Sequence, residues 1–284
     1  MPLVPMTAFL EDAKKHKYAV GQFNINNLEF VQAITQAAKE ENSPVIFGVS
    51  EGAMRYMGIE YTVAMSKAAA EIAGVPVALH LDHGSSFDVV MKCIRAGFSS
   101  VMFDGSHHSF EDNIRLTKQV VEAAHAVGVS VEGELGTIGG VEDDVNVAEE
   151  DAALAKPDEA IRFWEETKVD YVAIAVGTAH GMYKGEPKIR FDIIEEVAKN
   201  IDAPIVLHGG SGVPDEAIRK SISCGVGKIN VNTENQVACT EVIRQILAAK
   251  PNEIDPRKYL GPARDAIKEV VKGKMRLFGS SNRA

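Results

Sequence analysis

The chain has 284 residues, of which 45% are hydrophobic and 25% charged, and its formal net charge is −10. This size and composition indicate a globular protein with an ample core, and no apolar run approaches the roughly 18 residues that a membrane span needs. The negative charge argues against nucleic acid as the main partner, and an anionic substrate would require a locally positive site.

Eight apolar, β-branched runs recur along the chain, and each is followed by a segment of helical periodicity. The runs are continuous rather than alternating, which is typical of strands buried on both faces of a parallel sheet. The predicted strands are Ala19–Ile25, Pro44–Val49, Val75–Leu81, Ser100–Asp104, Val129–Glu134, Asp170–Val176, Pro204–His208 and Gly227–Val231. The predicted helices are Leu28–Glu41, Tyr61–Ala73, Phe87–Ala96, Phe110–Val127, Asp158–Thr167, Phe191–Lys199, Pro214–Cys224 and Glu234–Lys250.

Eight such units in about 230 residues match one α/β architecture, the (β/α)₈ TIM barrel, in count and length. A doubly wound open sheet is the alternative, but it usually has fewer strands and a glycine-rich fingerprint after the first one. Here the first strand runs into Asn24-Ile25-Asn26-Asn27, without that fingerprint. We therefore expect a single TIM-barrel domain over residues 1–284, with an extra C-terminal helical segment that ends near Phe278.

Two connections after predicted strands are longer than the usual few residues. One runs from Gly136 to Pro157 and is glycine-rich, then acidic; the other runs from Gly177 to Pro187. Because both follow strands, both should lie over the carboxyl rim of the barrel, where long loops serve as lids. The simpler interpretation, that they are exposed connectors, stays open.

Three histidines stand at or just after the ends of predicted strands, and each is followed by glycine: His83, His180 and His208. A catalytic zinc site takes three protein ligands and keeps one position open. A single histidine at a rim is more often a hydrogen-bonding or substrate residue. Three at one rim favour a shared metal ion.

Carboxylates accompany these histidines. Asp82 directly precedes His83, Asp104 ends the fourth strand, and Glu132 and Glu134 share one face of the fifth. Neighbouring strand residues point to opposite faces, so Asp82 and His83 reach one pocket only if the strand end twists; otherwise Asp82 orients another group or caps a turn. Two buried carboxylates at close range have a raised pKa unless a cation compensates.

Two segments have the position of a phosphate site. Gly209-Gly210-Ser211-Gly212 follows the seventh strand, and Asn230-Val231-Asn232-Thr233 ends the eighth strand and caps the next helix. Helix N-termini bind phosphate through free backbone N–H groups, and barrels commonly place phosphate after strands seven and eight. Together with a metal, these segments supply the locally positive site that an anionic substrate requires.

A metal, a carboxylate and a phosphate site at one rim favour carbonyl chemistry on a sugar phosphate, with the metal as electron sink and the carboxylate moving protons. A lysine Schiff base is the other sink. The sixth strand carries no lysine, and Lys228 lies early in the eighth strand, away from the rim. The metal is therefore favoured.

Two other classes of protein fit the sequence less well. A metal-dependent barrel hydrolase usually has an HxH pair on the first strand, and this strand ends in Asn24-Ile25-Asn26. A barrel kept only as a binding or scaffold protein does not need Asp82 together with all three candidate ligands.

Seven segments together are specific to one family: Gly21–Asn24, Leu79–Gly84, Val131–Gly136, Gly139–Asp144, Gly181–Pro187, His208–Gly212 and Lys228–Thr233. With them the chain resembles the class II, metal-dependent fructose-1,6-bisphosphate aldolases over essentially its whole length. The resemblance implies zinc-dependent, reversible cleavage of fructose 1,6-bisphosphate to dihydroxyacetone phosphate and glyceraldehyde 3-phosphate, in glycolysis and gluconeogenesis. Tagatose-1,6-bisphosphate aldolases share the catalytic set and are the alternative, although the run Asp255–Pro262 and the tail Gly279-Ser280-Ser281 look more like the fructose enzymes.

The resemblance also implies residue roles. His83, His180 and His208 would bind Zn²⁺, and Asp82 would handle the proton of the C4 hydroxyl. Asp104 and Glu134 match a second divalent metal site, and Glu142 matches a residue that moves a proton of dihydroxyacetone phosphate. The site for that product, with Na⁺ or K⁺ nearby, matches Gly181, Gly209, Gly210, Ser211, Asn230, Val231, Asn232 and Thr233.

Three further positions match substrate contacts. Asn24 and Ser50 match aldehyde-side or other substrate positions, and Arg257 matches an arginine that reaches the second phosphate in a neighbouring subunit. The last match implies a homodimer or homotetramer.

The cellular compartment follows from the cysteines and the N-terminus. Cys93, Cys224 and Cys239 form no CxxC pair and no disulfide framework, and Met1-Pro2-Leu3-Val4 does not begin a secretory signal. We therefore expect a cytoplasmic protein.

Overall fold

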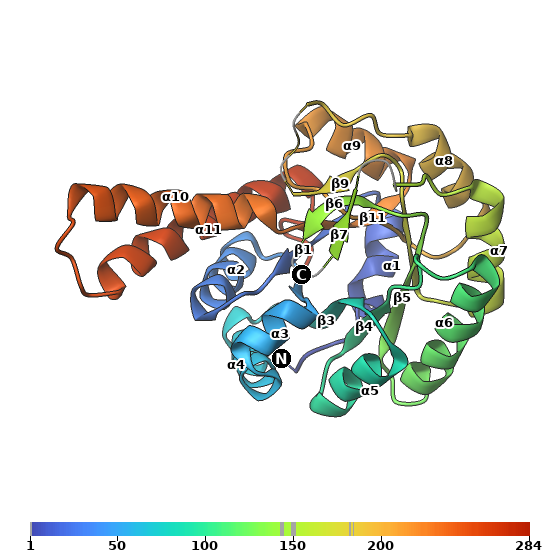
Figure 1. Ribbon diagram of the computed structural model, residues 1–284, viewed down its shortest axis with the longest axis horizontal. Coiled ribbons are helices and arrows are strands. Elements are labelled where there is room, and N and C mark those ends of the chain that lie inside the picture. Colours follow the sequence, from blue (N-terminus) through green and yellow to red (C-terminus); the bar gives the residue numbers. More distant parts are fainter. Residues whose placement is uncertain (1, 143–144, 149–151, 182, 184) are drawn as a thin grey trace.

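The computed structural model describes residues 2–142, 145–148, 152–181, 183 and 185–284. Its centre is a closed barrel of eight parallel strands in the order β1-β11-β10-β8-β5-β4-β3-β2, ringed by helices (Figure 1). This is a TIM barrel, as the recurring strand–helix units predicted. The barrel strands are β1 (Val20–Asn24), β2 (Val45–Val49), β3 (Val77–Gly84), β4 (Ser100–Phe103), β5 (Ser130–Leu135), β8 (Tyr171–Ile174), β10 (Ile205–Leu207) and β11 (Val226–Val231).

The surrounding helices begin where the sequence supplies caps. The side chains of Asn27, Ser50, Ser86 and Ser109 each accept a backbone N–H at a helix start, and such a cap stabilises a helix by about 0.5–2 kcal/mol. The helices that follow the barrel strands are α2 (Leu28–Glu41), α3 (Glu51–Met57), α4 (Ile59–Ala73), α5 (Phe87–Ala96), α6 (Phe110–His125), α7 (Pro157–Thr167), α8 (Phe191–Asn200), α9 (Asp215–Cys224) and α10 (Thr233–Ala249).

The barrel interior changes from apolar to polar along the strands. At the amino end, helix α1 (Thr7–His16) packs Phe9 and Leu10 against inward-facing residues such as Val20, Ala78 and Val206. Because strand residues two apart share a face, the next inward positions are Gln22 and Asn24 on β1, His80 and Asp82 on β3, Glu132 and Glu134 on β5, and Lys228 and Asn230 on β11. Polar groups therefore fill the carboxyl half of a barrel that is otherwise packed with branched apolar side chains.

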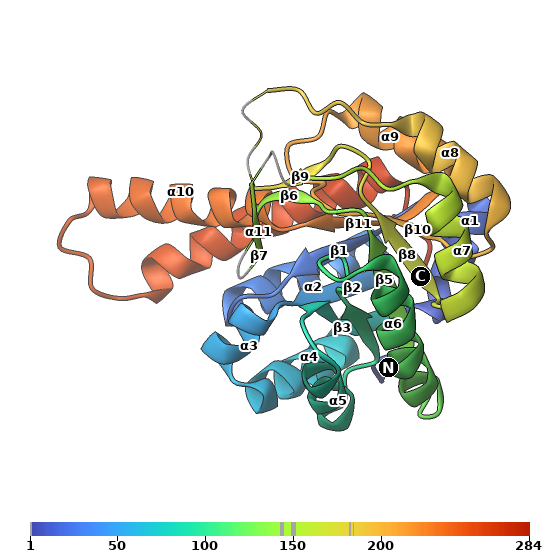
Figure 2. The ribbon, with the colours of Figure 1, turned by 45° about the vertical axis from the view of Figure 1, so that its right-hand side comes forward.

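Helix α11 (Arg257–Phe278) pairs with α10 to form an arm that projects away from the barrel (Figures 1 and 2). The returning half of α11 buries Ile267, Val271 and Met275 in the core and packs against α2. This is the extra helical segment expected from the sequence, and its tip carries the turn between Lys250 and Arg257.

Three features lay outside the sequence prediction: helix α1, helix α3 and a small second sheet. That sheet has the order β7-β6-β9, with strands β6 (Gly139–Glu142), β7 (Val145–Val147) and β9 (Ala179–His180). It joins the two long connections, which the sequence placed over the same rim as lids or exposed connectors, because Gly140 of β6 pairs with His180 of β9.

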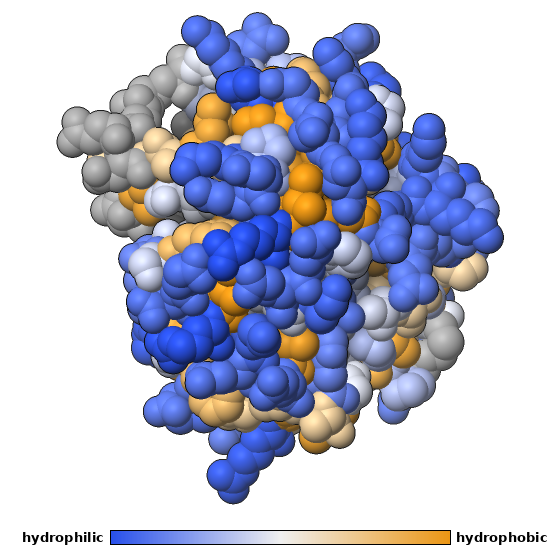
Figure 3. Space-filling model, turned by 90° about the vertical axis from the view of Figure 1, so that its right-hand side faces the viewer, coloured by the Kyte–Doolittle hydropathy of each residue, from blue (hydrophilic) through white to orange (hydrophobic). Residues whose placement is uncertain are grey.

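The outer surface over the helices opposite the arm is largely hydrophilic, with small scattered apolar patches (Figure 3). Among the described residues, no helix is long and apolar enough to cross a membrane. The cysteines Cys93, Cys224 and Cys239 are free thiols.

Candidate active site and metal centre

Strand β3 ends in a distortion that directs two neighbouring side chains into one pocket. The pairing of β3 with β4 shifts register between Leu81 and Gly84, and His83 has a φ of 51°. A non-glycine residue in this left-handed conformation costs on the order of 1–3 kcal/mol and persists where the surroundings impose it. The irregularity breaks the strand alternation, so Asp82 and His83 can face the same site, which is one of the two outcomes that the sequence left open.

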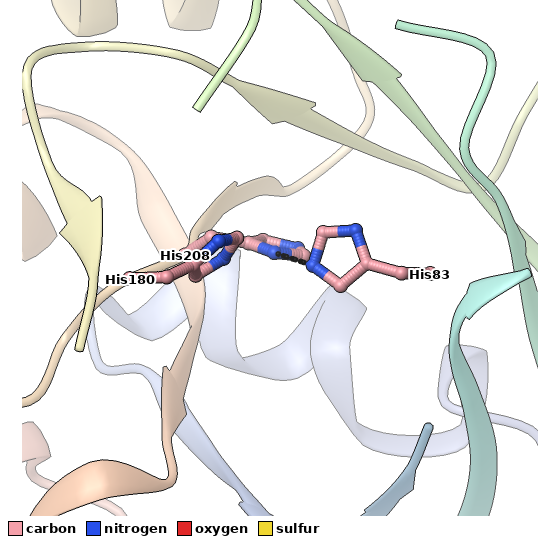
Figure 4. Close-up of side chains that lie close together, drawn as sticks. All are labelled: His83, His180 and His208. Carbon is pink, nitrogen blue, oxygen red and sulfur yellow. Dashed lines mark hydrogen bonds between the residues drawn. The ribbon is translucent and has the colours of Figure 1, made fainter. Parts of the chain in front are cut away.

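The three candidate ligands converge at the carboxyl rim. His83 lies on β3, His180 on β9, and His208 directly follows β10. One ring nitrogen of each histidine lies within 4.8 Å of a ring nitrogen of each of the other two. The Nε2 atom of His83 lies 3.0 Å from Nδ1 of His208. Figure 4 shows His83 reaching from one side toward the other two rings.

These nitrogens fit a zinc ion. Zinc binds imidazole nitrogen at about 2.0–2.1 Å, which in a tetrahedral site separates two ligand nitrogens by about 3.3 Å. Burial lowers the pKa of His180 and of His208, which favours the neutral rings that a metal needs. A metal ion would replace the proton that His83 and His208 now share.

A second group of ligand atoms adjoins the first. Nδ1 of His83 donates to Oδ2 of Asp104 at 2.8 Å and lies 3.8 Å from Oε2 of Glu134. Burial and the nearby Asp104 raise the pKa of Glu134 well above its usual value. Burial would lower the pKa of His83, but Asp104, Asp82 and Glu134 raise it. A cation would relieve this crowding of carboxylates, so the predicted second metal position also has a suitable donor set.

Asp82 is buried and held by two carboxamides. Asn24 Nδ2 donates to Asp82 Oδ2 at 3.0 Å, and Asn230 Nδ2 donates to Oδ1 at 3.3 Å. Burial would raise the pKa of Asp82, but His83, His208 and Lys228 hold it below the usual range. The carboxylate is therefore ionised and held in one orientation. Asn24 and Asn230, expected as substrate residues, here orient Asp82.

The two predicted phosphate segments contact each other. Gly210 N–H donates to the Asn230 carbonyl at 2.9 Å, and Ser211 Oγ accepts from the N–H groups of Asn232 and Glu234 at 3.3 Å. Gly209 has a φ of 66°, and a Cβ there would collide with the Ala179 carbonyl. The segment Asn230–Thr233 places Val231 in the core as the last residue of β11 and begins α10 at Thr233.

Two buried carboxamide oxygens lie in the second of these predicted phosphate segments. Asn230 Oδ1 and Asn232 Oδ1 have no hydrogen-bond partner within the described residues. Hard monovalent and divalent cations prefer such oxygen ligands. The arrangement suits the Na⁺ or K⁺ expected beside the phosphate.

The remaining predicted site residues are Ser50, Gly181, Glu142 and Arg257. Ser50 follows β2 and caps α3 through its Oγ, and Gly181 follows His180 with a φ of 89°. Glu142 ends β6, but its side chain lies outside the described residues. Arg257 is the exposed first residue of α11, next to the turn at the tip of the arm, where it pairs with Asp255 at 2.8 Å.

Lys228 has a buried partner that the sequence did not indicate. It lies below the rim, as predicted, but it points into the barrel and its Nζ lies 2.8 Å from Glu132 Oε2, with both side chains fully buried. The other oxygen of Glu132 accepts from His208 Nε2 at 2.9 Å. Burial would raise the pKa of Glu132, but Lys228 and His208 hold it at about 2. Sequence position placed Glu132 on the inward face without revealing these partners.

Tyr183, which the sequence did not single out, ties one lid connection to the phosphate segment. Its hydroxyl donates to the Gly209 carbonyl and accepts from Ala179 N–H, both at 2.8 Å. Replacing Tyr183 with phenylalanine should raise KM for the phosphorylated substrate by about 10-fold, because two hydrogen bonds of about 0.5–1.5 kcal/mol each are lost. Zinc affinity should stay unchanged.

Steady-state kinetics and zinc titration of Tyr183→Phe check this. The matched control is Tyr18→Phe, whose hydroxyl donates to Asp12 at the opposite end of the barrel. An unchanged KM in Tyr183→Phe would show that this contact does not shape the phosphate site.

A TIM barrel with converging histidines and carboxylates at its carboxyl rim is the framework of a metal-dependent barrel enzyme. The family model described as "Fructose-bisphosphate aldolase class-II" matches residues 4–283. The chain is 60% identical over 287 residues to the "Probable fructose-bisphosphate aldolase" of Bacillus subtilis, covering 100% of both. It is 56% identical to the "Fructose-bisphosphate aldolase" of Geobacillus stearothermophilus, covering 100% of this chain and 99% of that protein.

A solved structure agrees. The crystal structure of the YdjI aldolase from Escherichia coli K12 superposes with a TM-score of 0.87 at 32% identity, covering 99% of each chain. The chain belongs to the class II fructose-bisphosphate aldolase family.

Proposed function

We propose that this protein is a zinc-dependent lyase that reversibly cleaves fructose 1,6-bisphosphate into dihydroxyacetone phosphate and glyceraldehyde 3-phosphate, as a cytoplasmic enzyme of glycolysis and gluconeogenesis. The observation that carries the proposal is the convergence of His83, His180 and His208 beside the buried carboxylate of Asp82. The relatives named for this activity and their full-length similarity support the substrate.

The chain's own residues account for the proton chemistry. Asp82, ionised and held by Asn24 and Asn230, takes the proton of the C4 hydroxyl as the bond between C3 and C4 breaks and the aldehyde leaves. Glu142 is proposed to return a proton to C3 of the three-carbon product. In the synthetic direction each residue acts in reverse.

The metal would be held by His83, His180 and His208, and when bound it supplies Lewis-acid polarisation of the C2 carbonyl. Asp104 and Glu134 form the proposed second divalent position. The phosphate of the three-carbon product would lie against Gly181, Gly209–Ser211 and Asn230–Thr233, with Na⁺ or K⁺ nearby, while Ser50 contacts the aldehyde portion.

The sugar is tested directly by supplying fructose 1,6-bisphosphate and tagatose 1,6-bisphosphate to the purified protein, each with and without chelator. The two sugars differ at one carbon. We expect faster, chelator-sensitive cleavage of the fructose substrate. A higher kcat/KM for tagatose 1,6-bisphosphate would assign the protein to the alternative activity and leave the mechanism unchanged.

A homodimer or homotetramer is proposed from the arm. Exposed apolar side chains lie on α2, α4, α10 and the arm tip: Leu28, Tyr61, Ile72, Val237 and Ile254. Two of them, Leu28 and Ile72, line a groove of about 550 Å³ between α2, α4 and α11. Burying such a surface against a second copy of the chain removes it from water. The arm would then deliver Arg257 to the second phosphate at the partner's site.

Complementation tests this placement of Arg257. Homodimers of Asp82→Ala and of Arg257→Ala should each be impaired, the second mainly in KM for the bisphosphate. Mixed dimers pair an intact Asp82 with an intact Arg257 from the other chain, so co-refolded mixtures should regain about a quarter of wild-type activity. Activity that stays at the average of the two parents would place Arg257 at its own chain's site or at none.

A further inference from the structure

The geometry points to Glu132 and Lys228 as positioning residues of the metal centre: they hold His208 in the orientation and tautomer that direct its Nδ1 atom toward the ion. This inference rests on the proposed function only in taking His83, His180 and His208 as zinc ligands. It gives a role to Glu132 and Lys228, two buried residues that are not themselves proposed to contact the substrate or the metal.

The contacts define the tautomer. His208 Nε2 lies 2.9 Å from Glu132 Oε1, and both side chains are fully buried. A carboxylate can only accept, so the Nε2 atom carries the hydrogen and the Nδ1 atom keeps its lone pair. Nδ1 is the atom that faces Nε2 of His83 at 3.0 Å. Glu132 therefore selects the ligand atom.

Lys228 compensates the buried negative charge of the Glu132 carboxylate inside the barrel. Its Nζ donates to Glu132 Oε2 at 2.8 Å, with neither side chain exposed to solvent. A buried carboxylate without a cation costs several kcal/mol, and a paired one offers a strong, charge-assisted acceptor. Lys228 thus maintains the negative charge to which His208 donates.

A third side chain flanks the pair and limits its movement. His80 Nδ1 lies 2.9 Å from Ser100 Oγ, and its Nε2 lies 3.6 Å from Glu132 Oε2. Glu132 is therefore enclosed by His208, Lys228 and His80, at the level of the barrel one layer below Glu134.

His83 shows the same pattern at the rim. Its Nδ1 donates to Asp104 at 2.8 Å while its Nε2 faces the shared centre. A carboxylate on the far nitrogen fixes a metal-binding histidine and raises its basicity, and loss of such a partner typically weakens metal binding about 10- to 100-fold. Asp104 also belongs to the second group of ligand atoms, whereas Glu132 serves His208 alone among the three candidate zinc ligands.

A graded pair of charge-neutral variants tests the inference. Glu132→Gln/Lys228→Met keeps a neutral acceptor for His208, and Glu132→Leu/Lys228→Met removes the acceptor. Zinc affinity is measured on the metal-free proteins by competition with a chromophoric chelator. We expect the zinc dissociation constant to rise about 10-fold in the first variant and about 100-fold in the second. Thermal unfolding of the metal-free proteins reports whether each variant folds.

A merely structural role predicts a different pattern. If the pair only balances charge in the core, both folded variants should bind zinc as the wild type does, and that result would overturn the inference. Should the leucine variant fail to fold, the glutamine variant decides alone. The matched control is Asp170→Asn, which alters a carboxylate that also accepts from a histidine, His125, at 2.9 Å but lies away from the candidate zinc ligands. Its zinc affinity should equal that of the wild type.

The two proposals fail separately. A wild-type protein that binds one zinc but cleaves neither sugar bisphosphate would contradict the proposed function, while weakened zinc binding in the variants would still support the positioning role. A wild-type protein that cleaves the substrate with zinc, and whose folded variants keep full zinc affinity, would contradict the positioning role alone.

Discussion

Replacement of Asp82 with asparagine should lower kcat for aldol cleavage by about 10²–10⁴-fold, the usual contribution of a positioned general base. The reason is local: Asp82 is the ionised carboxylate beside His83, and Asn24 and Asn230 donate to its two oxygens. The asparagine keeps the shape of the side chain but cannot accept the C4 hydroxyl proton. Zinc affinity should change little, because the three histidines remain.

Two further variants complete this measurement. Asp82→Ala removes the side chain altogether, and should be no more active than Asp82→Asn. Asp88→Asn makes the same charge change at an exposed position in the first turn of α5 and should leave kcat unchanged. Near wild-type turnover in Asp82→Asn would remove Asp82 from the mechanism and move the search for the base to Glu134 or Glu142.

Removal of the metal should reduce cleavage by more than about 10³-fold, since the carbanion formed at C3 would lose its electron sink. One equivalent of Zn²⁺ should restore activity, and borohydride should trap no covalent adduct with the substrate. A Schiff base requires a lysine amine that is free to attack a carbonyl. Lys228, the lysine on the barrel interior near the site, is fully buried in an ion pair with Glu132.

The result that would reverse this conclusion is equally definite. Full activity after exhaustive chelation, together with a borohydride-trapped adduct on any lysine, would replace the metal mechanism with covalent catalysis. Activity restored equally by every divalent ion would keep the mechanism but leave the identity of the native metal to cellular measurement.

Strand-end positions allowed the sequence to locate much of the site. A histidine at the carboxyl end of a buried barrel strand must lie at the carboxyl rim, so His83 and His208 could be placed by topology alone. The same argument placed Asp104, Glu134 and the segment Gly209–Ser211. Periodicity likewise identified the eight strands, because strands buried on both faces form continuous apolar runs.

Contacts between strands could not be predicted this way. Strand alternation indicates that Glu132 and Lys228 face inward, but not that they meet each other and His208. The irregular end of β3 accompanies a register shift in its pairing with β4. The residues around His83 do not by themselves indicate its φ of 51°. Asn24 and Asn230 were assigned to substrate by resemblance, and their bonds to Asp82 depend on the closure of β1 beside β11.

The lid connections show the same limit. Their sequences placed both connections over the carboxyl rim but did not indicate that β6 and β9 pair through Gly140 and His180. Deletion of residues 139–144 would remove part of the first connection. The pairing now indicates that this deletion would also disturb His180, so single replacements such as Glu142→Ala are the sharper test of the lid.

The central claim is that His83, His180 and His208 hold one zinc ion beside Asp82. The most direct measurement is anomalous diffraction at the zinc absorption edge from crystals of the zinc-loaded protein. The account predicts a strong peak about 2.0–2.1 Å from one nitrogen of each histidine, including Nε2 of His83 and Nδ1 of His208. A peak held by other residues, or no peak at this rim in protein that cleaves the substrate, would contradict it.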